Sequence, residues 1–278
     1  MSKAQSLAGM RSALKWAGGK KKVVHEIASL LPKRGKTRLV EPFVGGGSVF
    51  LNLDFDEYLL IDMNKDLINL FNIIKNQPAA FIADAQQFFI DGNNDSEKYY
   101  QLRTQFNQST DSYERSLLFL YLNRHGYNGL CRYNKSGGYN VPFGRYKHPY
   151  FPSNELEYFS KKAQRATFIQ GDFETAFTQL NVSDVVYCDP PYSPINPTSN
   201  FTAYAGNSFT DEDQKRLVDY AEVAKKRNIP TLISNHYVDF TRELYKGATK
   251  KKLFQVQRSI SQKGKNRVKV QEILALYK

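Results

Sequence analysis

Short apolar runs alternate with longer stretches of helical periodicity along most of the chain, a pattern typical of an open parallel β-sheet flanked by helices. We predict five strands, at 38–41, 58–61, 166–170, 184–188 and 230–234. Four of them deliver an acid near the carboxyl end, namely Glu41, Asp62, Asp172 and Asp189. The carboxyl ends of parallel strands meet at one edge of a sheet, where open α/β sheets bind ligands. We therefore expect these acids to share a cleft.

Two further patterns extend the predicted sheet. A Thr210-x-x-Asp213 capping signal predicts a helix to about Arg227, and the fifth strand follows it. Strand-like runs at 254–260 and 267–276 flank a glycine-containing turn at 262–265. The tail is therefore expected to close the sheet as a β-hairpin.

The rhythm changes between residues 78 and 164. Helical stretches at 97–106 and 113–123 lead there into a loop rich in Gly, Asn and Tyr. We interpret 78–164 as an inserted domain that interrupts a larger domain made of 1–77 and 165–278. Residues 1–10 are expected to form a loosely ordered extension.

The charge narrows the class of partner. The 278 residues carry a formal net charge of +12, which favours a polyanion, nucleic acid first and an anionic membrane surface second. On charge alone, a merely basic soluble protein fits equally well. No signal peptide is recognised, and no apolar run approaches the roughly 18 residues that a membrane span needs. We expect a cytoplasmic protein with no membrane partner.

The cysteines and histidines show no metal-ligand spacing. Cys131 and Cys188 stand far apart without a second Cys or a His nearby at that spacing. The four histidines, at positions 25, 125, 148 and 236, show no H-x-x-x-H or comparable pattern. We expect surface or packing histidines, no disulfide framework and no metal site.

Three glycines directly after the first strand, at 45–47, let the backbone approach a ligand closely. Taken alone, such a turn is as often only a tight strand-to-helix connection. Asp62 ends the next strand 17 residues beyond Gly45, where its carboxylate could accept hydrogen bonds from both ribose hydroxyls or could cap a helix. The full G-x-G-x-x-G spacing of NAD sites is absent, and the acid-rich rim with Glu41 better suits a small cationic nucleoside such as S-adenosylmethionine.

The string Asp189-Pro190-Pro191-Tyr192 follows an apolar strand and faces the same cleft. It suits an exocyclic amine of a base, because the Asp189 side chain and the Pro190 carbonyl can accept its two hydrogens and direct its lone pair toward a methyl group. Proline fixes the backbone around that carbonyl. Tyr192 can stack on a base that has been flipped out of a duplex. The alternative is a Pro-Pro strand terminator with a capping Asp.

Three motifs occur in a characteristic order: Lys15-Trp16-Ala17-Gly18-Gly19-Lys20, then Glu41-Pro42-Phe43-Val44-Gly45-Gly46-Gly47-Ser48, then Asp189-Pro190-Pro191-Tyr192. With an insertion between the last two, the chain closely resembles the Dam family of bacterial and phage DNA adenine methyltransferases over essentially its whole length. The resemblance implies an α/β fold, namely a doubly wound, Rossmann-like methyltransferase sheet with an inserted, mainly helical DNA-recognition domain and a C-terminal β-hairpin. It also implies transfer of a methyl group from S-adenosylmethionine to N6 of a flipped-out adenine in double-stranded GATC.

The resemblance implies roles for individual residues. The catalytic residues would be Asp189, Pro190, Pro191 and Tyr192. The S-adenosylmethionine contacts would be Trp16, Ala17, Gly18, Lys20, Phe43, Gly45, Gly47, Asp62, Asp172, Phe173, Asp189 and Tyr192. The DNA contacts would be Lys15, Arg103, Arg124, Tyr127, Asn128, Leu130, Arg132, Pro142 and Arg145. Within that set Tyr127 would intercalate, Asn128 and Arg145 would hold phosphates, and Lys15 would reach the first guanine.

The inserted segment itself carries a nucleic-acid signal. Residues 115–154 contain no Asp or Glu, whereas an average stretch of that length would hold about four. The segment holds six tyrosines among its cations, the mixture expected of side chains that stack on bases or meet phosphates: Tyr121, Tyr127, Tyr133, Tyr139, Tyr146 and Tyr150. Leu130, Arg132 and Pro142 would read base edges by resemblance. Arg132 either reads guanine or holds a phosphate, and Arg124 could do either.

Several alternatives stay open at this point. The basic tail, from Lys250-Lys251-Lys252 onward, either follows the DNA backbone or is solvated. Related Pro-Pro-aromatic strings would serve structured RNA, a protein glutamine or cytosine N4, and a silent DNA-binding regulator could keep the same fold. The enzyme could be a solitary methylase, a restriction partner or phage-borne. A monomer is expected, since it can methylate both strands of a short palindrome in turn.

Overall fold

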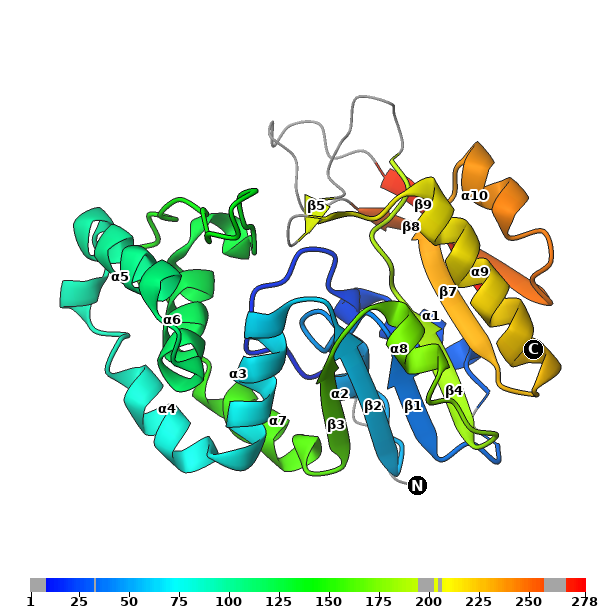
Figure 1. The fold of residues 1–278 in the computed structure, drawn as a ribbon, viewed down its shortest axis with the longest axis horizontal. Helices are drawn as coiled ribbons and strands as arrows, with labels where there is room; N and C mark the ends of the chain where they lie inside the picture. The colour runs from blue at the N-terminus through cyan, green and yellow to red at the C-terminus, as the bar shows by residue number, and fades with distance from the viewer. Residues whose placement is uncertain (1–8, 33, 195–202, 205–206, 258–268) are drawn as a thin grey trace, which may run out of the picture.

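The computed structural model describes residues 9–32, 34–194, 203–204, 207–257 and 269–278. A seven-stranded sheet lies at the centre of the fold (Figure 1). The strand order is β3-β2-β1-β4-β7-β9-β8. The strands are β1 (Arg38–Glu41), β2 (Glu57–Asp62), β3 (Ala166–Gln170), β4 (Asp184–Cys188), β7 (Thr231–His236), β8 (Lys250–Gln257) and β9 (Lys269–Tyr277). The first five run parallel, and β9 is antiparallel to both neighbours. Two short strands, β5 (Ala203–Tyr204) and β6 (Asn207–Ser208), pair with each other in a separate antiparallel sheet.

The predicted α/β sheet is confirmed, with small differences at its ends. All five predicted parallel strands are present, and the tail adds the antiparallel pair β8 and β9. The first tail strand begins at Lys250 rather than 254, because it continues to pair with β9 as far as Lys250 opposite Leu276. The turn at 262–265 and residues 1–8 lie outside the described residues.

Alternate residues of each central strand enter two apolar layers. In β1, Leu39 packs into one layer and Val40 into the other, and Tyr58 and Leu59 of β2 divide in the same way. One layer is covered by α1 (Val24–Leu30), α2 (Ser48–Asn52), α3 (Lys65–Asn76) and α7 (Ser153–Ala163). The other is covered by α8 (Phe173–Phe177), α9 (Asp211–Lys226) and α10 (Asp239–Leu244). The sheet is therefore doubly wound, and α9 begins at the predicted Thr210–Asp213 capping box.

The connection from β2 to β3 carries the insertion. Its elements are α3, α4 (Pro78–Gln86), η2 (Asp91–Asn93), α5 (Ser96–Gln108), α6 (Ser112–His125), η3 (Tyr127–Gly129) and α7. Helices α4 to α6 lie beyond the β3 edge of the sheet (Figure 1). Phe106 of α5 and Phe119 of α6 belong to the same apolar cluster as Phe71 of α3 and Tyr58 of the sheet. The apolar core of the insertion is thus continuous with one of the two apolar layers of the sheet. The predicted domain boundaries at 78 and 164 stay a prediction.

Candidate active site

The turn after β4 meets the short helix η1 (Lys20–Lys22) and strand β7 around one carboxylate. The Nζ of Lys20 lies 2.9 Å from Asp189 Oδ1, and the Ser234 hydroxyl donates to the same oxygen at 2.9 Å. Lys20 also donates to the Gly18 carbonyl oxygen at 2.9 Å, and its Nζ lies 4.6 Å from the centre of the Tyr192 ring. Segments from both ends of the chain thus fix Asp189 and Tyr192 together.

Tyr192 is held at its edge and at its hydroxyl. The ring packs edge-on against His236, with ring centroids 4.8 Å apart, and its hydroxyl donates to Glu272 Oε2 at 3.3 Å. Burial raises the pKa of Glu272, Lys20 opposes that shift, and the charge of Asp189 adds to it. Two carboxylates and one ammonium group therefore surround the tyrosine.

A buried amide network supports the same turn from below. Asn235 Oδ1 accepts the Ser193 N–H at 3.0 Å, and Asn235 Nδ2 donates to Gln214 Oε1 at 3.1 Å and to the Tyr245 hydroxyl at 3.0 Å. Gln214 in turn donates to the Pro191 carbonyl oxygen at 2.8 Å. Asn235, Gln214 and Tyr245 are all buried. The backbone on both sides of Tyr192 is therefore fixed by groups that water does not reach.

The second acidic strand end holds the glycine turn. Asp62 Oδ2 accepts the Gly45 N–H at 2.9 Å, and Asp62 Oδ1 accepts the Asn64 N–H at 2.9 Å. Burial raises the pKa of Asp62, and these two hydrogen bonds oppose the shift. The residue that caps α3 is Asn64, whose side chain accepts the Leu67 N–H, so the helix-cap alternative for Asp62 is wrong.

Trp16 packs directly on this turn. Gly45 has φ 48° and Gly47 has φ 73°, backbone conformations that favour glycine. A Cβ at Gly45 would lie 2.8 Å from Trp16 Nε1, and one at Gly46 would lie 2.8 Å from Trp16 Cβ. The glycines are therefore required both for the turn and for the close approach of the 15–20 motif.

Glu41, the last residue of β1, is buried close enough to Asp189 to be affected by its charge. It is 2% exposed, and the Phe50 N–H is a backbone donor to it, but among the described residues its Oε1 has no hydrogen-bond partner. Burial and the charge of Asp189 raise the pKa of Glu41 well above its usual range. A buried carboxyl oxygen without a partner is costly unless a ligand or water satisfies it. Glu41 thus leaves one buried carboxyl oxygen unsatisfied among the described residues near Asp189.

Aromatic rings form a wall beside the third acid. Phe43 and Phe173 stack with centroids 5.7 Å apart, and Phe209 packs edge-on against Phe43 at 5.6 Å. Asp172 caps α8 through the Phe173 N–H and lies 3.6 Å from Arg216. Apolar faces next to carboxylates suit a planar base carried on a ribose.

The residues present fit a cationic nucleoside. Acidic side chains stand at the ends of four strands, one of them has a buried oxygen without a partner in the described part of the chain, and aromatic faces lie beside them. Such a set offers acceptors to hydroxyl and ammonium groups and a negative environment to a sulfonium ion. In the part of the chain that the structure describes, no group of His, Cys, Asp or Glu could hold a metal ion.

The helical insertion contains a loop, residues 127–150, that lies beside the 15–20 motif. Lys15 N–H and C=O are bound by the buried side chain of Asn123 at 2.8 Å each, and Lys15 Nζ lies 3.5 Å from the centre of the Tyr146 ring. Burial, together with the charge of Arg124, lowers the pKa of Lys15 to about 8. Arg124 itself is buried and donates to the Tyr150 carbonyl oxygen at 2.9 Å, so it supports the loop from inside.

The other residues predicted to contact DNA lie around this loop. Tyr127 is 50% exposed, and Asn128, Arg132, Pro142 and Arg145 are also exposed. Asn128 and Arg145 both have φ 53°, which marks two tight bends in the loop. Leu130 is partly buried. Arg103, on α5, donates to the Val141 carbonyl oxygen at 3.1 Å.

The sequence-based interpretation of the tyrosines is wrong for half of them. Tyr121 and Tyr139 are fully buried, and Tyr133 is largely buried with its hydroxyl on Asp66 Oδ2 at 2.7 Å. Tyr127 and Tyr150 are exposed. The reason is that α6 is enclosed by neighbouring elements and that the 130–140 segment turns alternate residues inward. The absence of Asp and Glu from a segment therefore does not predict which of its tyrosine rings are buried.

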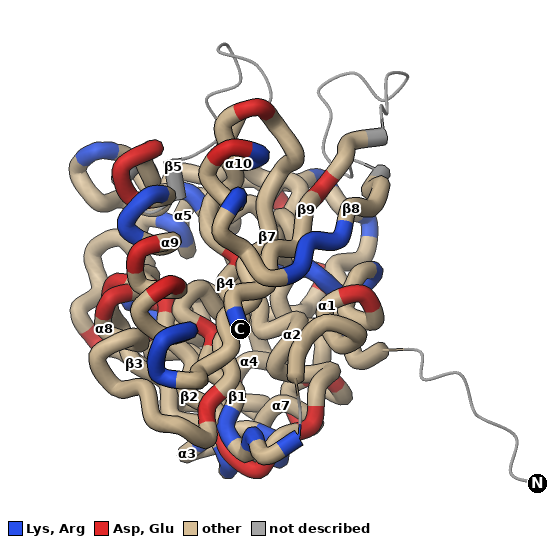
Figure 2. Tube along the Cα trace, turned by 90° about the vertical axis from the view of Figure 1, so that its right-hand side faces the viewer, with Lys and Arg blue, Asp and Glu red and all other residues tan. Residues whose placement is uncertain are grey.

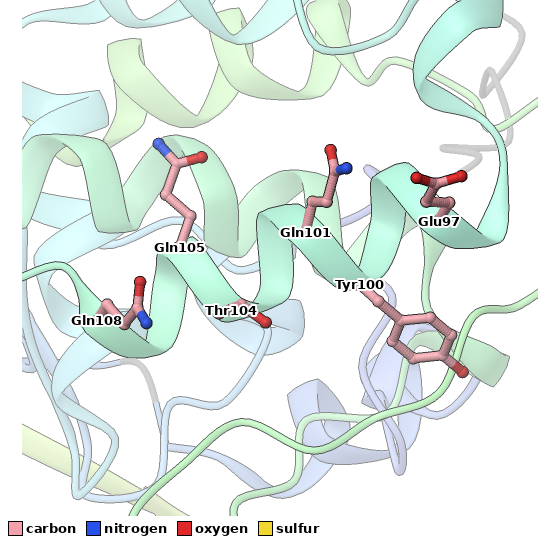
Figure 3. A pocket seen from close by; sticks show the side chains of 6 residues that line it. All are labelled: Glu97, Tyr100, Gln101, Thr104, Gln105 and Gln108. Atoms are coloured by element: carbon pink, nitrogen blue, oxygen red, sulfur yellow. The ribbon is translucent and has the colours of Figure 1, made fainter.

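Two further surface features lie outside the candidate site: a basic run on β8 and a hollow on α5. Figure 2 shows a run of basic positions at the start of β8, beside α1, where Lys252 forms an ion pair with Glu26 and donates to Ser29 Oγ at 3.3 Å. The exposed side of α5 forms an open hollow from one polar helical face, lined by Glu97, Tyr100, Gln101, Thr104, Gln105 and Gln108 (Figure 3). Among the described helices none is long and apolar enough to cross a membrane.

Sequence reasoning missed the groups that come from other strands. Ser234, Asn235 and His236 follow one another at the end of β7, and Glu272 comes from β9. Phe209 precedes α9, and Asn64 follows Asp62. These positions carry no motif. The only available signal was that β7 ends at the same edge of the sheet as β4.

Comparison with known proteins agrees with this geometry. The family model for the D12 class N6 adenine-specific DNA methyltransferase matches residues 16–260. The DNA adenine methylase of Vibrio cholerae is 55% identical over 268 residues, which cover 96% of this chain and 96% of that protein. The DNA adenine methylase of Escherichia coli K12 is 53% identical, covering 96% and 95%, and that of Haemophilus influenzae is 51% identical, covering 96% and 93%. The chain belongs to the D12 class of N6 adenine-specific DNA methyltransferases, and it has the doubly wound, Rossmann-like fold expected of one.

Proposed function

We propose that this DNA adenine N6-methyltransferase uses S-adenosylmethionine as its methyl donor and modifies an adenine flipped out of double-stranded GATC. The observation that carries the proposal is the placement of Asp189 and Tyr192 on one turn, fixed by Lys20, Ser234 and Glu272. The DNA adenine methylase relatives, which align over almost the whole chain, support the same substrate class.

The fixed turn suits the amine of a flipped adenine. The amine is a poor nucleophile because its lone pair is delocalised into the ring. Asp189 and the Pro190 carbonyl would accept its two hydrogens, which localises the lone pair on nitrogen. Tyr192 would stack on the base and offset part of the few kcal/mol lost on unpairing and unstacking. Most of the rate enhancement would then come from alignment of the reacting groups.

The donor site would be formed by the acids and rings beside this turn. S-adenosylmethionine would supply a methyl group bound to a positively charged sulfur. The sulfur leaves as a neutral thioether, which is an excellent leaving group. Asp62 would bind the ribose hydroxyls, Phe43 and Phe173 would contact the base, and Asp172 would lie at the rim. The other proposed contacts are Trp16, Ala17, Gly18, Lys20, Gly45 and Gly47. Glu41, whose Oε1 has no hydrogen-bond partner among the described residues, would accept a hydrogen bond from the donor's ammonium group.

The loop from Tyr127 to Arg145 would read the DNA. Arg132 would pair with a guanine, because its planar fork matches the O6 and N7 acceptors. Tyr127, half exposed, would fill the space that the adenine leaves, and Asn128 and Arg145 would meet phosphates. Residues 78–164 would thus act as the target-recognition domain. A monomer in the cytoplasm, bound to chromosomal DNA, would suffice for both strands of the site.

The proposal is tested with two duplexes that differ at one base pair, one containing a single GATC and the other GTTC. Labelled S-adenosylmethionine is supplied, and the methylated base is identified after digestion. We expect N6-methyladenine in the GATC duplex alone. Equal labelling of both duplexes would support S-adenosylmethionine as the donor but refute the proposed specificity for GATC. Absence of label from both would refute the proposed donor or substrate.

A further inference from the structure

We propose that Asn64 is a positioning residue that couples the donor site to the reading of DNA sequence. Its backbone N–H binds the Asp62 carboxylate, while its side-chain Nδ2 donates to Cys131 Sγ at 3.3 Å. Cys131 directly precedes Arg132. The inference rests on the proposed function, because it takes Asp62 to bind the donor and Arg132 to contact a base.

The first end of the link is fixed to the donor site by hydrogen bonds. Asn64 is buried, and its side-chain oxygen caps α3 by accepting the Leu67 N–H at 3.1 Å. The Asp62 carboxylate has one oxygen on the Asn64 N–H and the other on the Gly45 N–H. Ribose hydroxyls that donate to Asp62 would share these oxygens with the two N–H groups. Occupation of the donor site would therefore be transmitted to Asn64 directly.

The second end is held by hydrogen bonds as well. Cys131 is buried, and Tyr133 beside it donates to Asp66 Oδ2, which also accepts from Arg115 at 2.9 Å. Across the segment, Tyr139 binds the Leu130 carbonyl oxygen at 3.0 Å. Side-chain hydrogen bonds thus tie residues 130–140, as one piece, to the start of α3.

Arg132 lies on the outer side of this piece. It is exposed, and its Nε and NH2 groups donate to the side chain and the carbonyl of Asn140 at 2.7 and 3.0 Å. The guanidinium is therefore pre-oriented on its own hairpin, and the position of the hairpin decides where the fork points. Its backbone neighbour Cys131 is the contact with Asn64, so a small displacement of Asn64 re-aims Arg132.

Coupling of this kind is reciprocal: if the bound donor raises the ratio of the GATC to the GTTC affinity, the donor must bind the GATC complex more tightly than the GTTC complex by the same factor. It is measured without turnover by using S-adenosylhomocysteine, the demethylated donor. Fluorescence anisotropy gives the affinities for the GATC and GTTC duplexes with and without saturating S-adenosylhomocysteine. The coupling factor is the increase in the GATC to GTTC affinity ratio that S-adenosylhomocysteine produces.

Three variants isolate the link. Asn64→Ser keeps an oxygen that caps α3, and stays neutral, but lacks the amide donor. Cys131→Ala removes the acceptor, while Cys131→Ser restores one. Asp95→Ser is the matched control, because Asp95 caps α5 in the same way, accepting the Lys98 N–H at 2.9 Å, at an exposed site.

We expect the wild type and Asp95→Ser to show a coupling factor of about 5 or more, within the common range for linked sites. Asn64→Ser and Cys131→Ala should each bring it within about 2-fold of unity, Cys131→Ser should restore part of it, and the Asn64→Ser/Cys131→Ala double variant should lose nothing further. Retention of the wild-type factor in both single variants, or a factor of one in the wild type, would overturn the inference. If the wild type nevertheless makes N6-methyladenine only in GATC, the proposed function stands and the coupling alone is refuted.

Discussion

Lys20 and Asp189 form a 2.9 Å ion pair at the centre of the site, although 168 positions separate the two residues in sequence. The same ammonium group lies over the Tyr192 ring and opposes the rise in the pKa of Glu272. Lys20 is 8% exposed, so its charge is poorly screened by solvent. It therefore balances two carboxylates that would otherwise repel each other across the tyrosine.

Lys20→Met should reduce methyl transfer by about 10-fold or more, since the loss of one partner leaves buried charge uncompensated. The pKa of Glu272 should rise further. An acid with a raised folded-state pKa favours folding at low pH and loses that contribution as pH rises through the folded pKa. The melting temperature of the variant should therefore approach that of the wild type at pH 5 and fall below it toward pH 8. Lys22→Met, at the exposed end of η1, is the control, and a pH-independent difference for Lys20→Met would contradict the account.

Asp189→Ala should lower methyl transfer by at least about 100-fold, the scale of losing a directed polar contact in a transition state. Binding of the GATC duplex should change little, because the loop residues that we propose to contact DNA are elsewhere. Single-turnover methylation and anisotropy measure the two properties separately. Asp211→Ala, at the first turn of α9, removes an acid outside the site. Substantial turnover by Asp189→Ala would remove the basis of the proposed chemistry.

The acids of the site were predictable because a parallel sheet brings the carboxyl ends of its strands to one edge. Asp62 and Asp189 needed no more than their positions after apolar runs. Lys20 was predicted from the motif that contains it, but its ion pair with Asp189 was not, because side-chain reach across the cleft has no periodic signature. Glu272 was not predicted at all, since it comes from an antiparallel strand after the central sheet is complete.

The loop was predicted less well, for a physical reason. Tyrosine is amphipathic, so the same residue can fill a core through its ring or contact a base. Tyr121 stacks on His125 with ring centroids 4.0 Å apart inside the insertion, whereas Tyr127, six residues later, is half exposed. Only the packing of α6 distinguishes the two.

Arg132→Ala should weaken binding of GATC by about 1 to 3 kcal/mol and relax the preferred sequence, as expected for loss of a bidentate contact to a base. Competition binding against duplexes with each base pair of GATC replaced measures the loss at every position. Lys135→Ala, on the same exposed hairpin, removes an equal charge. If both variants weaken all duplexes uniformly, Arg132 holds a phosphate rather than reading a base.

Asn235→Leu should lower the rate constant of methyl transfer much more than it weakens DNA binding. The change leaves the Ser193 N–H, the Gln214 side chain and the Tyr245 hydroxyl without their partner, at about 1 to 3 kcal/mol for each buried group that stays unsatisfied. Gln214→Met tests the same support from the other side, through the Pro191 carbonyl. Rates and urea unfolding are measured together. Loss of stability with an unchanged rate constant would show that the network supports the fold alone.

His125 should make the protein less stable in mild acid. The side chain is 1% exposed between Tyr121 and Phe89, and burial lowers its pKa to about 4. The unfolded chain therefore binds a proton below about pH 6.5 that the folded protein does not bind, and stability falls as pH drops from 6.5 toward 4. Between pH 6.5 and 5 the loss is at most about 2 kcal/mol. Urea unfolding at these two pH values should show this loss of stability in the wild type and a smaller loss in His125→Phe. His25→Asn, which removes an exposed imidazole, is the control and should show the same loss as the wild type. An equal loss in all three proteins would show that other groups cause the acid sensitivity.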